Sequence, residues 1–206
     1  ERAILLNSNS STAHAVRGWA LTFLGNYIDA ETEIQKALEL DDKNPLAHAY
    51  YVELLVNSGS YESLLKAVEE SRVAIDLAPN SLEAHRARGL ILEVTDNREE
   101  AVREYQAAIE INSNIPDVPL ALGRTYRVLG VLDKAVEEFN IANMLNPADP
   151  LPDLYTSRTY ASVGDYAKAI QFAEQAVKDV PTDPYMRGNL GVMLYHNFDY
   201  ALAITQ

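Results

Sequence analysis

The feature that most constrains this chain is an internal repeat of 34 residues. From Ser11 onward, one pattern of small and large apolar residues returns along almost the whole sequence. A repeat of this length is one supersecondary unit that cannot bury its apolar face alone, so neighbouring units have to stack. The sequence therefore predicts a continuous stack of units, with contacts only between neighbours.

The repeat also predicts where the units begin and end. The predicted segments are the end of a preceding repeat (1–10), a repeat (11–44), a repeat with an insertion (45–81), three further repeats (82–115, 116–149 and 150–183) and a truncated repeat (184–206). We expect the extra residues of the longer repeat to lie between Tyr61 and Ala67. They lengthen the turn or add most of a helical turn, and a local functional loop is the alternative.

Small residues recur at positions that predict two packed helices in each unit. Glycine inside a helix costs ~1 kcal/mol relative to alanine, so its repeated use calls for a close approach between helices. The first-helix positions are Gly18, Gly89, Gly123, Ser157 and Gly191, and the second-helix positions are Ala30, Ala67, Ala101, Ala135, Ala169 and Ala203, followed two turns later by Ala37, Ala74, Ala108, Ala142 and Ala176.

Turn residues separate the predicted helices. Glycine ends four first helices, where a left-handed conformation is easiest for glycine; these are Gly25, Gly59, Gly130 and Gly164. Asp96 and Phe198 stand at the corresponding turns of two other units. Most prolines fall between units, where they stop one helix or start the next.

The pattern resembles the tetratricopeptide repeat family over nearly the whole chain. The best-matching residues are the pair Leu122-Gly123, the turn Gly164-Asp165-Tyr166, and the ending Leu145-Asn146-Pro147. The resemblance implies an all-α fold, a right-handed α-solenoid of stacked antiparallel helix pairs. The family's usual tryptophan at the fourth position is replaced by His14, His48 and His85.

Composition excludes several classes of function. Hydrophobic residues make up 48% of the chain and charged residues 23%, which is typical of a folded soluble protein. The net charge of −13 disfavours nucleic acid and anionic membrane surfaces as partners. No apolar run is long enough to span a membrane, no signal peptide is visible, and the compartment is not indicated.

We find no motif that carries catalysis. The sequence has no cysteine, no glycine-rich phosphate loop, no paired-histidine zinc helix and no nucleophile elbow. The three equivalent histidines suggest a metal ladder, but equivalent residues in adjacent units lie roughly 10 Å apart, whereas zinc ligands lie within ~2.1 Å of the metal. We therefore predict structural histidines, no metal or cofactor, and no enzyme activity.

Four arginines are the candidate binding residues for an acidic partner. The resemblance implies that first helices line a concave groove, and the groove positions include Arg86, Arg124, Arg127 and Arg158. Arginine binds carboxylates through two parallel hydrogen bonds. The alternative is that Glu53, Glu83, Glu93 and Asp117, at neighbouring positions, neutralise these arginines.

Three aromatic residues on the same predicted wall are candidates for holding an apolar anchor of the ligand. They are Trp19, Phe23 and Tyr50, and large aromatic residues often dominate interface energetics. The alternative is that they only pack between units.

The leading hypothesis is a non-catalytic scaffold that binds a segment of a partner protein in its groove. A second hypothesis is a structural module that stacks end to end through exposed apolar faces into oligomers or filaments. A third is the recognition arm of a larger enzyme. Light scattering over a concentration series distinguishes the first two.

Overall fold

The computed structural model describes residues 9–205, so most of the predicted repeat end at 1–10 lies outside the described residues. The described chain consists of helices and short turns and contains no strand. It divides into an N-terminal unit, residues 1–113, and a C-terminal unit, residues 114–206.

The N-terminal unit consists of three successive helix pairs. Its helices are α2 (Ser11–Phe23), α3 (Tyr27–Leu40), α4 (Pro45–Ser58), α5 (Tyr61–Leu77), α6 (Leu82–Val94) and α7 (Arg98–Ile111). The members of each pair, α2 with α3, α4 with α5 and α6 with α7, pack along each other, and the first helices α2, α4 and α6 also contact their neighbours. This arrangement brings side chains from successive first helices onto one wall.

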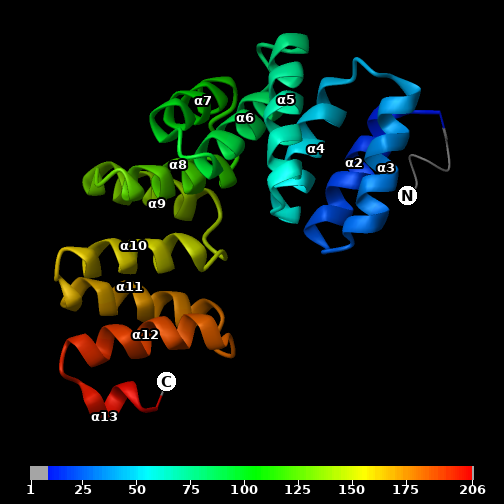
Figure 1. The fold of residues 1–206 in the computed structure, drawn as a ribbon. Helices are drawn as coiled ribbons and strands as arrows, with labels where there is room; N and C mark the ends of the chain where they lie inside the picture. Colours follow the sequence, from blue (N-terminus) through cyan, green and yellow to red (C-terminus); the bar gives the residue numbers. More distant parts are fainter. Residues whose placement is uncertain (1–8, 206) are drawn as a thin grey trace. The chain divides into compact units, whose positions relative to one another are not determined.

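The C-terminal unit repeats this plan. Its helices are α8 (Asp117–Val128), α9 (Leu132–Leu145), α10 (Leu151–Ser162), α11 (Tyr166–Asp179), α12 (Pro184–His196) and the short α13 (Tyr200–Ala203). Within this unit the helices from α9 to α13 follow one another as successive layers (Figure 1). The predicted all-α class and the stacking of adjacent helix pairs are confirmed.

The glycines of the first helices allow the close packing that the sequence predicts. A Cβ atom added at Gly123 would lie 2.6 Å from the ring of Phe139, and one added at Gly89 would lie 2.6 Å from the ring of Tyr105. The facing alanines, such as Ala101 and Ala135, are fully buried. Because no larger residue fits at these crossings, the recurring glycines and alanines determine how closely the two helices of a pair approach.

The turns within pairs adopt the predicted left-handed conformation. The four turn glycines have φ between 66° and 81°. Asp96 and Phe198 adopt the same conformation with φ of 67°, although a positive φ is uncommon for residues other than glycine. The backbone of the turn is thus the same whether or not a glycine occupies it.

The longer second repeat accommodates its additional residues inside a helix. Helix α5 has 17 residues, whereas the other complete second helices have 14. Ser60 caps α5 through a hydrogen bond from the backbone N–H of Ser63 to its side chain, and Ala67 is fully buried. The added residues therefore form most of a turn at the start of α5.

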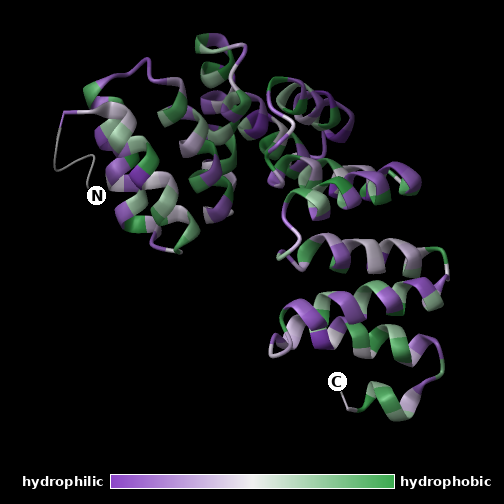
Figure 2. Cartoon of the chain, turned by 180° about the vertical axis from the view of Figure 1, so that it is seen from behind, coloured by the Kyte–Doolittle hydropathy of each residue, from purple (hydrophilic) through white to green (hydrophobic). Residues whose placement is uncertain are grey.

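Most helices present one apolar and one polar side. Hydrophobic and hydrophilic bands alternate along them (Figure 2), as expected for helices that bury a single face. Among the described residues, none of the helices combines the length and the apolar character needed to cross a bilayer.

Candidate functional site

The predicted aromatic residues of the N-terminal unit form one cluster on its first helices. The ring of Trp19 on α2 stacks on Tyr50 of α4, with centroids 5.1 Å apart, and meets Phe23 edge-on at 5.0 Å. Tyr50 is buried, Trp19 is partly buried, and Phe23 is 65% exposed. The cluster therefore packs between helices and also offers an apolar surface to solvent.

Glu53 connects this aromatic cluster to Arg86. Its Oε2 accepts a hydrogen bond of 2.9 Å from the indole N–H of Trp19, and its Oε1 forms an ion pair with the Arg86 guanidinium. Arg86 also lies over the Trp19 ring, 5.7 Å from its centroid. Burial raises the pKa of Tyr50, and the charge of Glu83 adds to the rise. Arg86 is thus paired with a carboxylate of the neighbouring first helix.

The arginines of the C-terminal unit have different partners. Arg127 of α8 lies over the ring of Tyr155 on α10, and Arg158 of α10 lies over the ring of Tyr185 on α12, at 6.0 and 4.9 Å. Arg158 also donates a hydrogen bond of 3.2 Å to the side-chain oxygen of Asn189. Tyr155 and Arg158 are three residues apart and share one face of α10. Successive arginine–tyrosine contacts therefore run across the three first helices of this unit.

The guanidinium groups of Arg127 and Arg158 do not pair with a carboxylate in the described part of the chain. The Nε atom of Arg127 is buried without a hydrogen-bond partner. Arg124, the fourth predicted residue, is partly buried on α8, three residues before Arg127. The C-terminal unit thus holds cationic groups that nearby acids do not neutralise.

The three equivalent histidines each contact a glutamate of the second helix in their own pair. The distances from Nδ1 to the carboxylate oxygen are 2.6 Å for His14 with Glu33, 2.5 Å for His48 with Glu70, and 2.6 Å for His85 with Glu104. In residues 9–205, no group of three or more histidine or acidic side chains could hold a metal ion. Each histidine therefore connects two helices of one pair.

Two carboxyl groups of the C-terminal unit were not singled out from the sequence. Asp153 and Glu138 each have one buried oxygen without a hydrogen-bond partner. Burial, with the charge of Asp179, raises the pKa of Asp153 to about 6, and burial, with the charge of Glu137, raises the pKa of Glu138. The signal that could have found them is positional, because they occupy the repeat positions that hold histidine and glutamate in the N-terminal unit.

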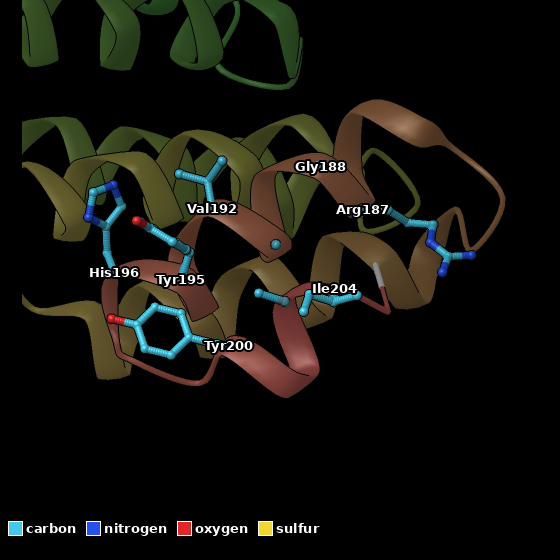
Figure 3. Close-up of a pocket in the computed structure, with 9 residues that line it drawn as sticks. Arg187, Gly188, Val192, Tyr195, His196, Tyr200 and Ile204 are labelled. Atoms are coloured by element: carbon cyan, nitrogen blue, oxygen red, sulfur yellow. The ribbon is translucent and has the colours of Figure 1, made fainter.

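An apolar hollow of about 520 Å³ lies against α12 and α13. Val192, Tyr195 and His196 line it from α12, whereas Tyr200 and Ile204 line it from the short last helix and its end (Figure 3). Arg187 lies at the far end, where its Nη2 donates to the backbone oxygen of Thr205. The hollow lies within the size range of small ligand sites and has almost no polar lining.

Comparison with known families defines the class of this protein. Tetratricopeptide-repeat family models match residues 11–44 and residues 156–206. Both matches fall on helix pairs described above. The two matches support a tetratricopeptide-repeat protein. A search of curated proteins finds no significant sequence match.

Solved structures share the fold at low sequence identity. A Pseudomonas aeruginosa pilF structure has a TM-score of 0.76 at 20% identity and covers 95% of this chain and 87% of its own. PilW, described as a widely conserved type IV pilus biogenesis factor, has a TM-score of 0.83 at 18% identity over 95% and 89%. YrrB, described as a TPR protein with an unusual peptide-binding site, has a TM-score of 0.62 at 20% identity over 96% of both chains. Such likeness establishes the helical-repeat fold.

Proposed function

We propose that this protein is a non-catalytic interaction scaffold whose C-terminal unit binds an acidic segment of a partner protein. The observation that carries the proposal is the pair Arg127 and Arg158, which contact tyrosine rings and an amide but no carboxylate among the described residues. YrrB, a structural neighbour described as having a peptide-binding site, is consistent with a peptide ligand.

The chemistry of these arginines suits a carboxylate ligand. A guanidinium group that stacks on an aromatic ring keeps its N–H edge available for hydrogen bonds in the ring plane. A carboxylate that reaches such a group gains a charge-assisted, often bidentate, contact. In a chain with net charge −13, the two groups provide a local cationic surface for an acidic segment. Arg124, on the same helix as Arg127, belongs to this proposed acid-binding site, which thus consists of Arg124, Arg127 and Arg158.

The aromatic cluster of the N-terminal unit has a different proposed role. Its exposed member, Phe23, adjoins Trp19 and offers a contact for an apolar side chain of the partner. Arg86 holds this cluster together through Glu53, so we assign it to positioning Trp19 instead of to binding acid. Tyr50 supports the Trp19 ring from beneath.

Peptide binding by charge-reversed variants tests the proposed acid-binding site. The probe is a fluorescein-labelled glutamate- and leucine-rich peptide, compared with a lysine- and leucine-rich peptide of equal length. We expect Arg127→Glu with Arg158→Glu to weaken binding of the acidic peptide by well over tenfold, measured by fluorescence anisotropy at low and high salt. The physical reason is the loss of two charge-assisted contacts and their replacement by repulsion.

The matched control is Arg72→Glu with Arg103→Glu, since these two arginines are 66% and 67% exposed and pair with Glu69 and Glu100 on their own helices. This control has the same charge change at sites with no proposed role, so it should bind the acidic peptide nearly as well as the unchanged chain. Equal affinities of the double variant and the control for the acidic peptide would contradict the proposed acid-binding site. Equal binding of the acidic and basic peptides would do the same.

A further inference from the structure

His48 and His85 hold equivalent positions with equivalent contacts. The Nδ1 atom of His48 lies 2.5 Å from Oε2 of Glu70, and that of His85 lies 2.6 Å from Oε2 of Glu104. Each Nε2 atom lies 2.9 Å from a backbone carbonyl oxygen six residues earlier, that of Asp42 for His48 and that of Pro79 for His85. Two successive helix pairs thus use one and the same four-atom arrangement.

The chemistry of these contacts requires a particular form of the ring. A carbonyl oxygen and an ionised carboxylate can only accept hydrogen bonds. A neutral imidazole has one N–H donor, whereas the imidazolium form has two. Both contacts of His48 can therefore be hydrogen bonds only when its ring carries two protons, and the same holds for His85.

We propose that His48 and His85 are proton-dependent clasps that hold the N-terminal unit together. In each clasp the doubly protonated ring connects three segments: the loop before a first helix, the first helix itself, and the second helix of the pair. Loss of one proton converts one of the two hydrogen bonds into a contact between two acceptors, so the pair of helices is held less tightly. The N-terminal unit is accordingly less stable at alkaline pH.

The surroundings of His48 favour its protonated form. Burial lowers the pKa of His48, but the hydrogen bonds and charges of Glu70 and Asp42 outweigh burial and place it above the ordinary value of 6.5. Glu70 is itself faced by Lys66 of α5, whose own partners include Tyr51 and, more distantly, Glu31 of α3. A group with a raised native pKa stabilises the fold fully below its unfolded value, and that contribution is lost as pH rises through the native value.

The clasps lie next to the candidate ligand surface. His48 is two residues before Tyr50 on α4, and His85 directly precedes Arg86 on α6. Because loosened first helices shift the residues that they carry, the clasps provide a route by which proton concentration could change the geometry of the aromatic cluster. This link goes beyond the proposed function and does not depend on what the scaffold binds.

The test uses the whole 206-residue chain. We expect ¹⁵N NMR to show both ring nitrogens of His48 protonated at pH 6, and amide exchange in α4 and α5 to become faster, after correction for intrinsic rates, as pH rises to 8.5. The melting temperature should fall by about 2–4 °C over that range if the clasps contribute about 1 kcal/mol. His48→Gln with His85→Gln should remove most of that fall.

His196→Gln is the matched control, because the His196 ring stacks on Tyr166 and has no carboxylate partner among the described residues. This variant should retain the alkaline fall in melting temperature. The proposal is overturned if the double variant retains the full fall, or if the His48 ring in the unchanged chain carries a single proton at pH 6. The NMR measurement decides the matter even if the double variant does not fold.

Discussion

The two units of this protein use the same repeat position in opposite ways. In the N-terminal unit the fourth residue of each repeat is His14, His48 or His85, and each faces a glutamate of the second helix. In the C-terminal unit the corresponding residues of the first two repeats are Pro119 and Asp153. The same backbone therefore carries a polar contact in one unit and lacks it in the other.

The difference leaves buried polar groups in the C-terminal unit. Glu138 occupies the position of the histidine-bound glutamates, but the residue opposite is Pro119, and one oxygen of Glu138 has no hydrogen-bond partner. A buried polar atom without a partner costs roughly 1–3 kcal/mol. The comparison shows that helix packing and polar pairing are separate properties of a repeat, because the first persists where the second is lost.

The largest expected effect is at Asp153, a residue that is only 5% exposed. Its native pKa of about 6 lies above the ordinary 3.8, so the stability that protonation supplies is complete below pH ~4 and lost by pH ~6. We expect Asp153→Asn to increase the free energy of unfolding at pH 7.5 by up to about 3 kcal/mol, with little change at pH 3.5. Urea unfolding at both pH values measures the effect.

Asp133→Asn serves as its control, since Asp133 is exposed in the first turn of α9. This variant should change stability by less than about 0.5 kcal/mol at either pH. Asp153→Asn should preserve the acceptor for the hydrogen bond that Asn143 makes with Asp153. A variant no more stable than the unchanged chain at pH 7.5 would mean that Asp153 is not an uncompensated charge, and the contrast between the units would weaken.

The second-largest expected effect tests the close helix packing at glycine that the two units share. Gly89→Ala and Gly123→Ala each place a Cβ atom 2.6 Å from an aromatic ring, and overpacking of this kind costs typically 1–3 kcal/mol. We expect a loss of about 2 kcal/mol in each case, measured by thermal or urea unfolding. In Gly188→Ala the new Cβ meets nothing within 4 Å, so this control should gain up to about 1 kcal/mol of helix propensity. A cost in one unit and none in the other would contradict a common packing rule.

The smallest expected effect is an attempt to convert one unit into the other. Pro119→His places a histidine opposite Glu138, as in the N-terminal repeats. We expect a gain of about 1 kcal/mol at pH 6 that declines by pH 8.5, as the new ring loses its charge. Pro119→Gln controls for removal of the proline. A gain that is identical for both variants, or independent of pH, would show that the position alone does not create a clasp.

Much of the fold was predictable from the sequence, because it depends on residue size at regular intervals. The buried alanines of the second helices and the left-handed turns lie where the repeat places them, including Asp96 and Phe198. The sequence left open whether the additional residues of the longer repeat extend a turn or a helix, and the structure places them in α5.

The candidate site was predictable only as a set of positions. Arg86 and Arg158 both follow from the groove pattern, yet one forms an ion pair with Glu53 and the other contacts Tyr185 and Asn189. Residues that are 27 to 33 positions apart make these contacts, and small differences in side-chain direction decide between a carboxylate and a ring. Repeat spacing does not contain that information.

By itself the sequence determined the class of this protein: helix pairs stacked in a tetratricopeptide-repeat arrangement, carried by glycines and alanines that return every 34 residues. Only the tertiary structure decided which charges are paired, which histidines contact two acceptors at once, and which carboxyl oxygens are buried without a hydrogen-bond partner. The physical reason is that packing depends on the volume at each position, whereas polar contacts depend on distances of about 3 Å between atoms of different helices.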